Sequence, residues 1–305
     1  MICVICGEER EKSKEHIIPE SMGNKEFITH SVCEECNNKL GTNVDDYLCN
    51  HIITKIIRKD LGLLGKEKKE IKIFPSTLCD ENGNKYLFRD DKPIYPTSVK
   101  VQDGVLRVEA QTVEEAINVA KKRLSKMDYS EDDINKIIVS ASKGNAINNQ
   151  PTFNLSADIN KAQYLLVGIK IAYEFACEVF GLSYSNDKIG IQLRNELYKV
   201  SRMEKKSIPD KIDYKLIQKY ASIATDASSI ISNVIKSYSQ EESFAIRHLC
   251  IIHDSKDHKL ICQVILLCEP IFSFTVILSE NATKYISNRG SKIAIVLKNG
   301  ECYYF

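Results

Sequence analysis

Two pairs of cysteines near the start of the chain have the spacing of metal ligands. Cys3 and Cys6 form one pair, and Cys33 and Cys36 form the other. Two such pairs suit the tetrahedral coordination of Zn²⁺ by thiolates. A zinc ion bound by four sulfurs has no open position for water or substrate, so it would be a structural cross-link in a segment too small for its own core. An accidental spacing or disulfides are the alternatives.

Between the pairs lie residues that could act on a phosphodiester. Glu15 and His16 are followed by an Ile-Ile-Pro segment, and Asn37 comes directly after the last cysteine. We expect a short strand ending at Pro19, where an imidazole and a carboxylate can both turn toward one cation and its attacking water. A neutral imidazole can take a proton from water. Carboxylate and carboxamide oxygens are hard ligands, so we expect His16 to be the base and Glu15 and Asn37 to hold catalytic Mg²⁺ or Mn²⁺.

Together these residues resemble the four-cysteine branch of the HNH endonuclease family, whose ββα-metal finger has the pattern C-x2-C, D/E-H-I-x-P, a glycine and C-x2-C-N. The resemblance covers about the first fifty residues: Cys3-Val4-Ile5-Cys6-Gly7, Glu15-His16-Ile17-Ile18-Pro19, Gly23 and Cys33-Glu34-Glu35-Cys36-Asn37, continued by Asn38-Lys39-Leu40-Gly41 and Val44-Asp45. It implies that His16 is the general base, that Glu15 and Asn37 are metal ligands, and that the substrate is nucleic acid.

One position departs from the family pattern. The middle Asn of the family steadies the loop that carries the base, and it lies nine residues before the final Asn. In this chain that position is Ile28. We therefore expect either that Thr29 or His30 supplies the hydrogen bond to the loop, or that Ile28 holds the loop by packing against Ile17 and Ile18.

Composition limits the class of protein. A chain of 305 residues can hold two domains, and the finger fills only a small part of it. Lys and Arg number 42 against 41 Asp and Glu, so no global basic field indicates a nucleic-acid partner, and phosphate contacts must be local. The remaining cysteines are scattered, mostly in apolar runs, as small buried residues are. With no signal segment and no membrane-spanning apolar run, we expect a cytoplasmic protein without membrane contact.

The pattern of the chain predicts an α+β fold with two domains. Residues 1–66 would form the ββα-metal zinc finger nuclease module with a buttressing helix from Val44 to about Leu64. Residues 67–305 would form a larger mixed helix and antiparallel-sheet domain, with a subdivision near 143–154. Its expected elements are β segments over 71–110, helices over 112–126, 130–140, 160–180, 189–200 and 214–238, and a β meander over 244–305.

The leading hypothesis is an endonuclease that hydrolyses DNA with structural Zn²⁺ and catalytic Mg²⁺ or Mn²⁺, and RNA stays open as a substrate. A finger with one catalytic metal cuts one strand at a time, so double-strand cleavage would need a homodimer or two encounters. The C-terminal domain could also bind a partner protein. By analogy, such fingers joined to larger domains occur in restriction, homing and antiphage defence proteins. The alternative is a zinc-knuckle module that binds nucleic acid or protein without catalysis.

Overall fold

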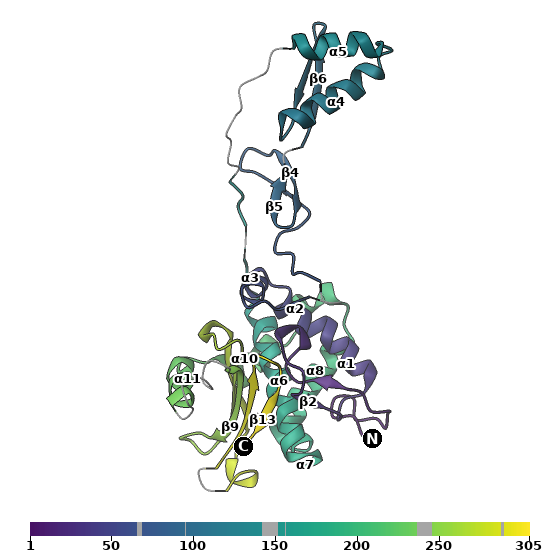
Figure 1. Cartoon of the computed structure of the whole chain (residues 1–305). Helices are drawn as coiled ribbons and strands as arrows, with labels where there is room; N and C mark the ends of the chain where they lie inside the picture. The colour runs from purple at the N-terminus through teal and green to yellow at the C-terminus, as the bar shows by residue number, and fades with distance from the viewer. Residues whose placement is uncertain (66–68, 95, 142–151, 156, 237–245, 288–289) are drawn as a thin grey trace. The chain divides into compact units, whose positions relative to one another are not determined.

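The computed structural model describes residues 1–65, 69–94, 96–141, 152–155, 157–236, 246–287 and 290–305 (Figure 1). The chain divides into two compact units, one made of Met1–Ile71 with Asp158–Phe305 and one made of Lys72–Ala157. This division differs from the expected boundary after residue 66, because the N-terminal segment belongs to the same unit as the C-terminal half. Most of the expected subdivision near 143–154 lies outside the described residues.

The first unit begins with a ββα finger, as the sequence predicted. Strand β1 (Glu15–His16) pairs antiparallel with β2 (Ile28–Thr29), so that Glu15 lies opposite Thr29 and His16 opposite Ile28. Helix α1 (Glu34–Leu40) then follows the second cysteine pair. The finger therefore presents Glu15 and His16 on a strand and Asn37 on the adjoining helix.

Helix α1 continues through a π-helical turn, η2 (Gly41–Asp45), into α2 (Asp46–Cys49). The helix predicted over residues 44–64 is wrong as a single element. His51 has an extended backbone, with φ −62° and ψ 140°, and the chain starts a new helix, α3 (Ile52–Asp60). One extended residue breaks the helical path even though the apolar spacing continues across it.

The remaining helices of the first unit follow the expected order with one interruption. They are α6 (Lys161–Phe180), α7 (Leu182–Ser185), α8 (Lys188–Ser201), α9 (Ile208–Lys211), α10 (Tyr214–Tyr220) and α11 (Ala227–Lys236), with 3-10 turns η1 (Glu20–Met22), η4 (Lys205–Ser207), η5 (Pro270–Phe272) and η6 (Ala282–Lys284). The predicted helix over 214–238 is wrong, because strand β8 (Ala221–Ile223) separates α10 from α11. Asn160 caps α6 by accepting hydrogen bonds from the N–H groups of Ala162 and Gln163.

A six-stranded antiparallel sheet forms the other layer of this unit. Besides β8 it contains β9 (Ile246–Asp254), β10 (Leu260–Ile265), β11 (Ser273–Ser279), β12 (Ser291–Leu297) and β13 (Cys302–Tyr304). The order is β13-β12-β9-β10-β11-β8. The predicted meander is wrong at one connection: β12 pairs with β9, because β8 already occupies the outer edge of β11.

Helix α6 lies between this sheet and the finger (Figure 1). It contacts β8, β10 and β11 on one side and β2, η2 and α2 on the other. The rings of Phe27 in the finger and Phe175 in α6 meet edge to face at 5.2 Å, within one hydrophobic core that also includes Phe274 of β11. The finger therefore shares its core with the C-terminal half of the chain instead of closing a core of its own.

The second unit is smaller, and its described residues form two antiparallel sheets and two helices. Its elements are β3 (Thr77–Cys79), β4 (Lys85–Arg89) and β5 (Lys92–Ile94) in one sheet, β6 (Ser98–Gln102) and β7 (Val105–Glu109) in a hairpin, and helices α4 (Val113–Ser125) and α5 (Glu131–Ser140). Thr112 caps α4 by accepting the N–H of Glu115 at 3.1 Å.

His248 of β9 joins the sheet to the finger. Its ring is fully buried. The Nε2–H donates to the carbonyl oxygen of Met22 at 2.9 Å, and Nδ1 accepts the N–H of Leu267 at 3.0 Å. These two partners require the neutral imidazole. Burial accordingly lowers the pKa of His248 to about 3.

We predict that His248 makes the fold sensitive to acid. The pKa is about 3 in the folded chain and 6.5 for a free histidine, so the unfolded chain binds the proton first. Stability is then lost progressively as the pH falls from about 6.5 toward 3. In His248→Gln the loss between pH 7 and pH 4 should be smaller than in the wild type by about 3 kcal/mol. Urea denaturation at several pH values measures this, with the exposed His258→Gln as control. The same pH dependence in His248→Gln and wild type would contradict the assignment.

Candidate functional site

The two predicted cysteine pairs converge on one point. The Sγ atoms of Cys3, Cys6, Cys33 and Cys36 all lie within 4.8 Å of one another. Thiolates bound tetrahedrally to Zn²⁺ at about 2.3 Å would be roughly 3.8 Å apart, so the four sulfurs fit this ion. None of the chain's eleven cysteines, all of which are described, forms a disulfide. The donor set of this cluster and its location around the finger's hairpin fit a structural zinc ion.

Local backbone geometry forms the first of these turns and activates its first sulfur. Gly7 has φ +75° and donates its N–H to the carbonyl oxygen of Cys3 at 2.8 Å, which closes a tight turn around the first pair. The thiol of Cys36 and neighbouring backbone N–H groups lower the pKa of Cys3 to about 4, against the effect of burial. At neutral pH this sulfur is a thiolate, the form that binds zinc.

His16 ends β1 with a half-buried imidazole. Its ring makes no hydrogen bond to any residue that the structure describes. Burial lowers the pKa of His16, and the positive charge of Lys14 acts in the same direction. The ring is therefore neutral at neutral pH and has a nitrogen free to accept a proton, as the predicted base requires.

Asn37, in the first turns of α1, reaches the segment that leads into β1. Its amide Nδ2 donates to the carbonyl oxygen of Lys14 at 3.0 Å and lies 3.4 Å from the hydroxyl of Ser13. The amide oxygen Oδ1 forms no hydrogen bond within the described part of the chain. Asn37 thus ties the finger helix to the strand and keeps one oxygen available as an acceptor or a metal ligand.

Glu15 lies differently from the expectation that it turns freely toward a cation. It is only 3% exposed, and its Oε1 accepts a hydrogen bond at 2.5 Å from the ammonium of Lys170 in α6. Its second oxygen, Oε2, has no hydrogen bond to the described residues. This segment therefore offers a divalent cation one oxygen from Glu15 and one from Asn37. These two oxygens suit a hard ion, and its other ligands would have to come from water or substrate.

Lys170 is surrounded by carboxylates that the sequence did not bring together. Its Nζ lies 3.2 Å from Asp45 Oδ2 and 3.2 Å from Glu174 Oε2. Burial by itself would lower the pKa of Lys170, but Asp45, Glu15 and Glu174 outweigh it and hold this pKa well above its usual value. Burial raises the pKa of Asp45 to about 7 and that of Glu174 well above its usual range. Asp45 and Glu174 therefore hold a proton more readily than free carboxyl groups do, which is the expected effect of burying acids together.

The backbone that carries the base is held through consecutive carbonyl groups. Lys170 Nζ lies 3.2 Å from the carbonyl oxygen of His16 and 3.4 Å from that of Ile17. The fully buried Asn24 takes the next one, donating from Nδ2 to the carbonyl oxygen of Ile18 at 2.6 Å. Asn24 also bonds both the N–H and the carbonyl oxygen of Phe27, which fixes the loop between β1 and β2.

Asn24, which the sequence did not suggest, holds the loop that follows the base. Of the two expected polar residues, His30 contacts the segment before the base, and the choice among Thr29, His30 and packing by Ile28 stays a prediction. Thr29 Oγ1 accepts the N–H of Ser31, and His30 Nδ1 lies 2.9 Å from the carbonyl oxygen of Ser13. The sequence feature that could have indicated Asn24 is its place as a polar residue directly after the motif glycine, Gly23. That glycine has φ +95°, and a Cβ there would lie 2.1 Å from Nη1 of Arg247.

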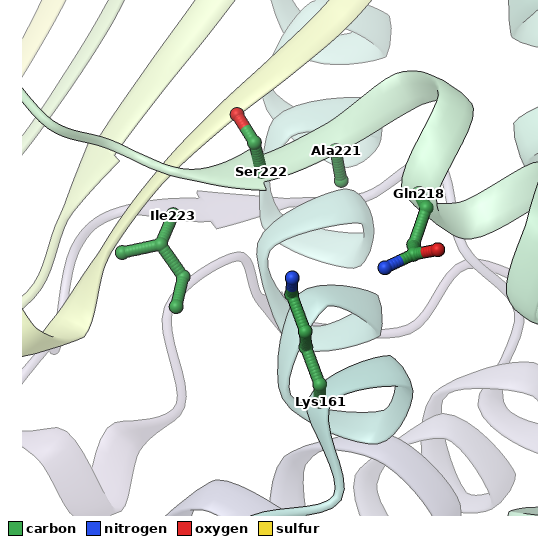
Figure 2. A pocket seen from close by; sticks show the side chains of 5 residues that line it. All are labelled: Lys161, Gln218, Ala221, Ser222 and Ile223. Carbon is green, nitrogen blue, oxygen red and sulfur yellow. The ribbon is translucent and has the colours of Figure 1, made fainter.

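A pocket elsewhere in the first unit lacks groups of this kind. It is lined by Lys161, Gln218, Ala221, Ser222 and Ile223 (Figure 2). Its only ionisable side chain is an ammonium, and no thiol, imidazole or carboxylate lines it.

No helix among the described residues has both the length and the apolar character needed to cross a membrane.

We predict one tightly bound zinc ion per chain. Cys33→Ser combined with Cys36→Ser removes two thiolates, so this variant should lose the metal and the order of the finger. Elemental analysis of the purified proteins measures the ratio, and Cys79→Ser, at an exposed cysteine of the second unit, should keep full zinc. Absence of zinc from the wild type, or full zinc in the double variant, would refute the site.

We predict a large cost for removing the Asn24 amide. Asn24→Ala deletes three buried hydrogen bonds and leaves backbone groups of Ile18 and Phe27 unsatisfied, so the free energy of unfolding should fall by about 2–4 kcal/mol. His30→Ala deletes one exposed hydrogen bond and should cost less than about 1 kcal/mol. Urea denaturation compares the two variants, and an equal loss in both would argue against Asn24 as the residue that holds the loop.

Comparison with known families agrees with this geometry. Residues 3–53 match the model of a family described as HNH endonuclease. Comparisons of the chain with curated proteins and with solved structures gave no match. The matched segment contains the four clustered cysteines, His16 and Asn37, but not Lys170. Residues 3–53 therefore form an HNH endonuclease domain of a four-cysteine variant, followed in the chain by a larger mixed α+β part.

Proposed function

We propose that the protein is a metal-dependent endonuclease that hydrolyses DNA phosphodiester bonds. The observation that carries this proposal is the state of His16, whose imidazole is neutral and makes no hydrogen bond to any described residue, while the backbone behind it is pinned at three consecutive carbonyl groups. A general base needs a free nitrogen and a fixed direction, and this arrangement supplies both.

In this proposal His16 takes a proton from a water molecule as the water oxygen attacks phosphorus. A bond forms between that oxygen and phosphorus, and the bond from phosphorus to the 3′ oxygen breaks. The 3′ oxygen leaves with the electron pair and takes a proton from solvent. The imidazole becomes positively charged and later returns its proton to solvent. The imidazole of His16 is half-buried, so its exposed part can contact a phosphate at the surface without a change in the backbone of β1.

Glu15 Oε2 and Asn37 Oδ1 are the side-chain oxygens of these two residues without a hydrogen bond to the described residues, and they would hold Mg²⁺ or Mn²⁺ beside His16. Such a cation, when bound, stabilises the negative charge on the phosphate and on the leaving oxygen. Asn37 serves the base as well, since its Nδ2 orients the segment leading into β1 through the carbonyl oxygen of Lys14. The four cysteines hold the frame through structural zinc and take no part in the hydrolysis.

A second function, binding of nucleic acid or protein without cleavage, is favoured by one observation. The ammonium of Lys170 already neutralises Glu15, the only carboxylate in the predicted metal set. A module that only binds would need neither the free imidazole nor the amide oxygen of Asn37. Catalysis is the stronger proposal because it gives all three groups a role.

We predict that the protein nicks plasmid DNA in Mg²⁺ or Mn²⁺ and that His16→Ala slows cleavage by about 100-fold or more, as loss of a general base does. His258→Ala, at a largely exposed histidine of the β9–β10 connection, is the matched control and should cleave normally. Gel analysis of supercoiled plasmid, with single-stranded RNA in parallel, follows the reaction, and zinc content shows that the variants are folded.

Undiminished cleavage in excess EDTA, or by His16→Ala, would rule out the proposed chemistry. DNA binding by the wild type without any cleavage would support the second function. Faster cutting of RNA than of DNA would reassign the substrate. The ratio of nicked to linear product shows whether one strand or both are cut in an encounter.

A further inference from the structure

We propose that Lys170, which lies outside the segment that matches the HNH family, is a positioning residue of the nuclease site. Its ammonium holds the strand that carries His16 and aims the Glu15 carboxylate, so that helix α6 completes the active site of the finger. This inference rests on the proposed function, because it assigns to Lys170 an effect on the same base and cation.

The contacts of Lys170 converge on β1. Its Nζ bonds Glu15 Oε1, the carbonyl oxygens of His16 and Ile17, and Asp45 Oδ2, all within 3.4 Å. The side chain is completely buried. The ammonium therefore touches the peptide groups on the C-terminal side of the base as well as the carboxylate on its N-terminal side.

These carbonyl contacts act on the direction of the imidazole. The carbonyl oxygen of His16 can point at the ammonium only over a narrow range of the backbone angle ψ of His16. That angle, with the strand pairing of His16 to Ile28, sets where the side chain leaves the backbone. A base misplaced by about 1 Å loses much of its effect, so a fixed backbone here bears directly on the rate.

The contact with Glu15 acts on the cation. By binding Oε1, Lys170 holds the carboxylate in one orientation and leaves Oε2 as its single available oxygen. Groups that hydrogen-bond to a metal ligand orient it, and their loss typically weakens metal binding or activity by 10–100-fold. A buried ion pair is in contrast a weak source of stability, because desolvation cancels most of its attraction. The cost of burying Lys170 is thus better explained by positioning than by stability.

Asp45 and Glu174 complete the surroundings of the ammonium. Asp45 comes from the π-helical turn η2 of the finger, and Glu174 lies one helical turn beyond Lys170 on α6. Removing Lys170 alone would leave three buried acids without their cation, and the chain could then fail to fold. A fair test therefore replaces these two acids first.

The reference protein for the experiment carries Asp45→Asn and Glu174→Gln, and the test protein adds Lys170→Met. Tyr173→Phe is the matched control, because Tyr173 also lies on α6 and its hydroxyl donates a hydrogen bond to the finger, but at the carbonyl oxygen of Val4 in the first cysteine pair. Three quantities are measured on each full-length protein: bound zinc, Mn²⁺ affinity without DNA by electron paramagnetic resonance, and kcat and KM on a DNA duplex.

Adding Lys170→Met should weaken Mn²⁺ binding and lower kcat by 10–100-fold relative to the reference protein, with zinc retained and the KM for DNA little changed. Tyr173→Phe should change neither quantity. Lys170→Gln in the same background keeps one donor for a carbonyl oxygen, so its Mn²⁺ affinity and kcat should lie between those of the reference protein and those of the Lys170→Met variant. It supplies the comparison if the Met variant lacks zinc.

Equal Mn²⁺ affinity and kcat in the reference protein and in a zinc-loaded Lys170 variant would overturn the inference. So would a wild-type protein that binds no Mn²⁺. If the wild type binds Mn²⁺ but cuts no nucleic acid, the proposed function fails by itself, and the change in Mn²⁺ affinity still decides whether Lys170 positions Glu15.

Discussion

The hydrogen bond from the buried ammonium of Lys170 to Glu15 is the interaction on which the rest of this structure depends. It joins a helix in the C-terminal half of the chain to the strand residue next to His16. Because an ammonium without water must be surrounded by oxygen atoms, this one contact determines several others. The carbonyl groups of His16 and Ile17, the π-helical turn that carries Asp45, and Glu174 all lie where they satisfy it.

The finger is consequently held by two kinds of interaction, metal ligation on one side and hydrogen bonds on the other. On one side, four sulfurs suited to zinc cross-link the turns around Cys3 and Cys33. On the other, hydrogen bonds hold the segment that follows His16, from Lys170 at the strand and from Asn24 in the loop. Metal ligation replaces the buried area that so short a segment lacks, whereas the polar contacts specify the direction of one side chain. Neither constraint can substitute for the other.

The C-terminal half acts as a cradle for the finger through polar anchors as well as a shared core. Tyr173 donates to the carbonyl oxygen of Val4, and Asn43 donates to those of Val200 and Met203. The carbonyl oxygen of Gly300, at the β12–β13 turn, accepts the N–H groups of Lys25 and Glu26. These contacts reach the finger at points distributed along its length, through its backbone at Val4, Lys25 and Glu26 and through the side chain of Asn43. The finger is therefore one part of a larger compact unit, and its core is continuous with that of the sheet.

Short-range spacing in the sequence predicted the cysteine cluster, the ββα order and the apolar helix now seen as α6, and it indicated His16 as the proposed base, because each depends on residues close together in the chain. Tertiary structure decided what surrounds the base. Lys170 is one of four charged residues in a largely apolar helix and is separated by 155 positions from its partner Glu15. No local pattern distinguishes it from a side chain that reaches solvent. The β12–β9 pairing was likewise decided by which sheet edge β8 left open. Asn24 lies between these cases, since its neighbour Gly23 was visible in the motif but its three hydrogen bonds exist only when the loop closes around a buried amide.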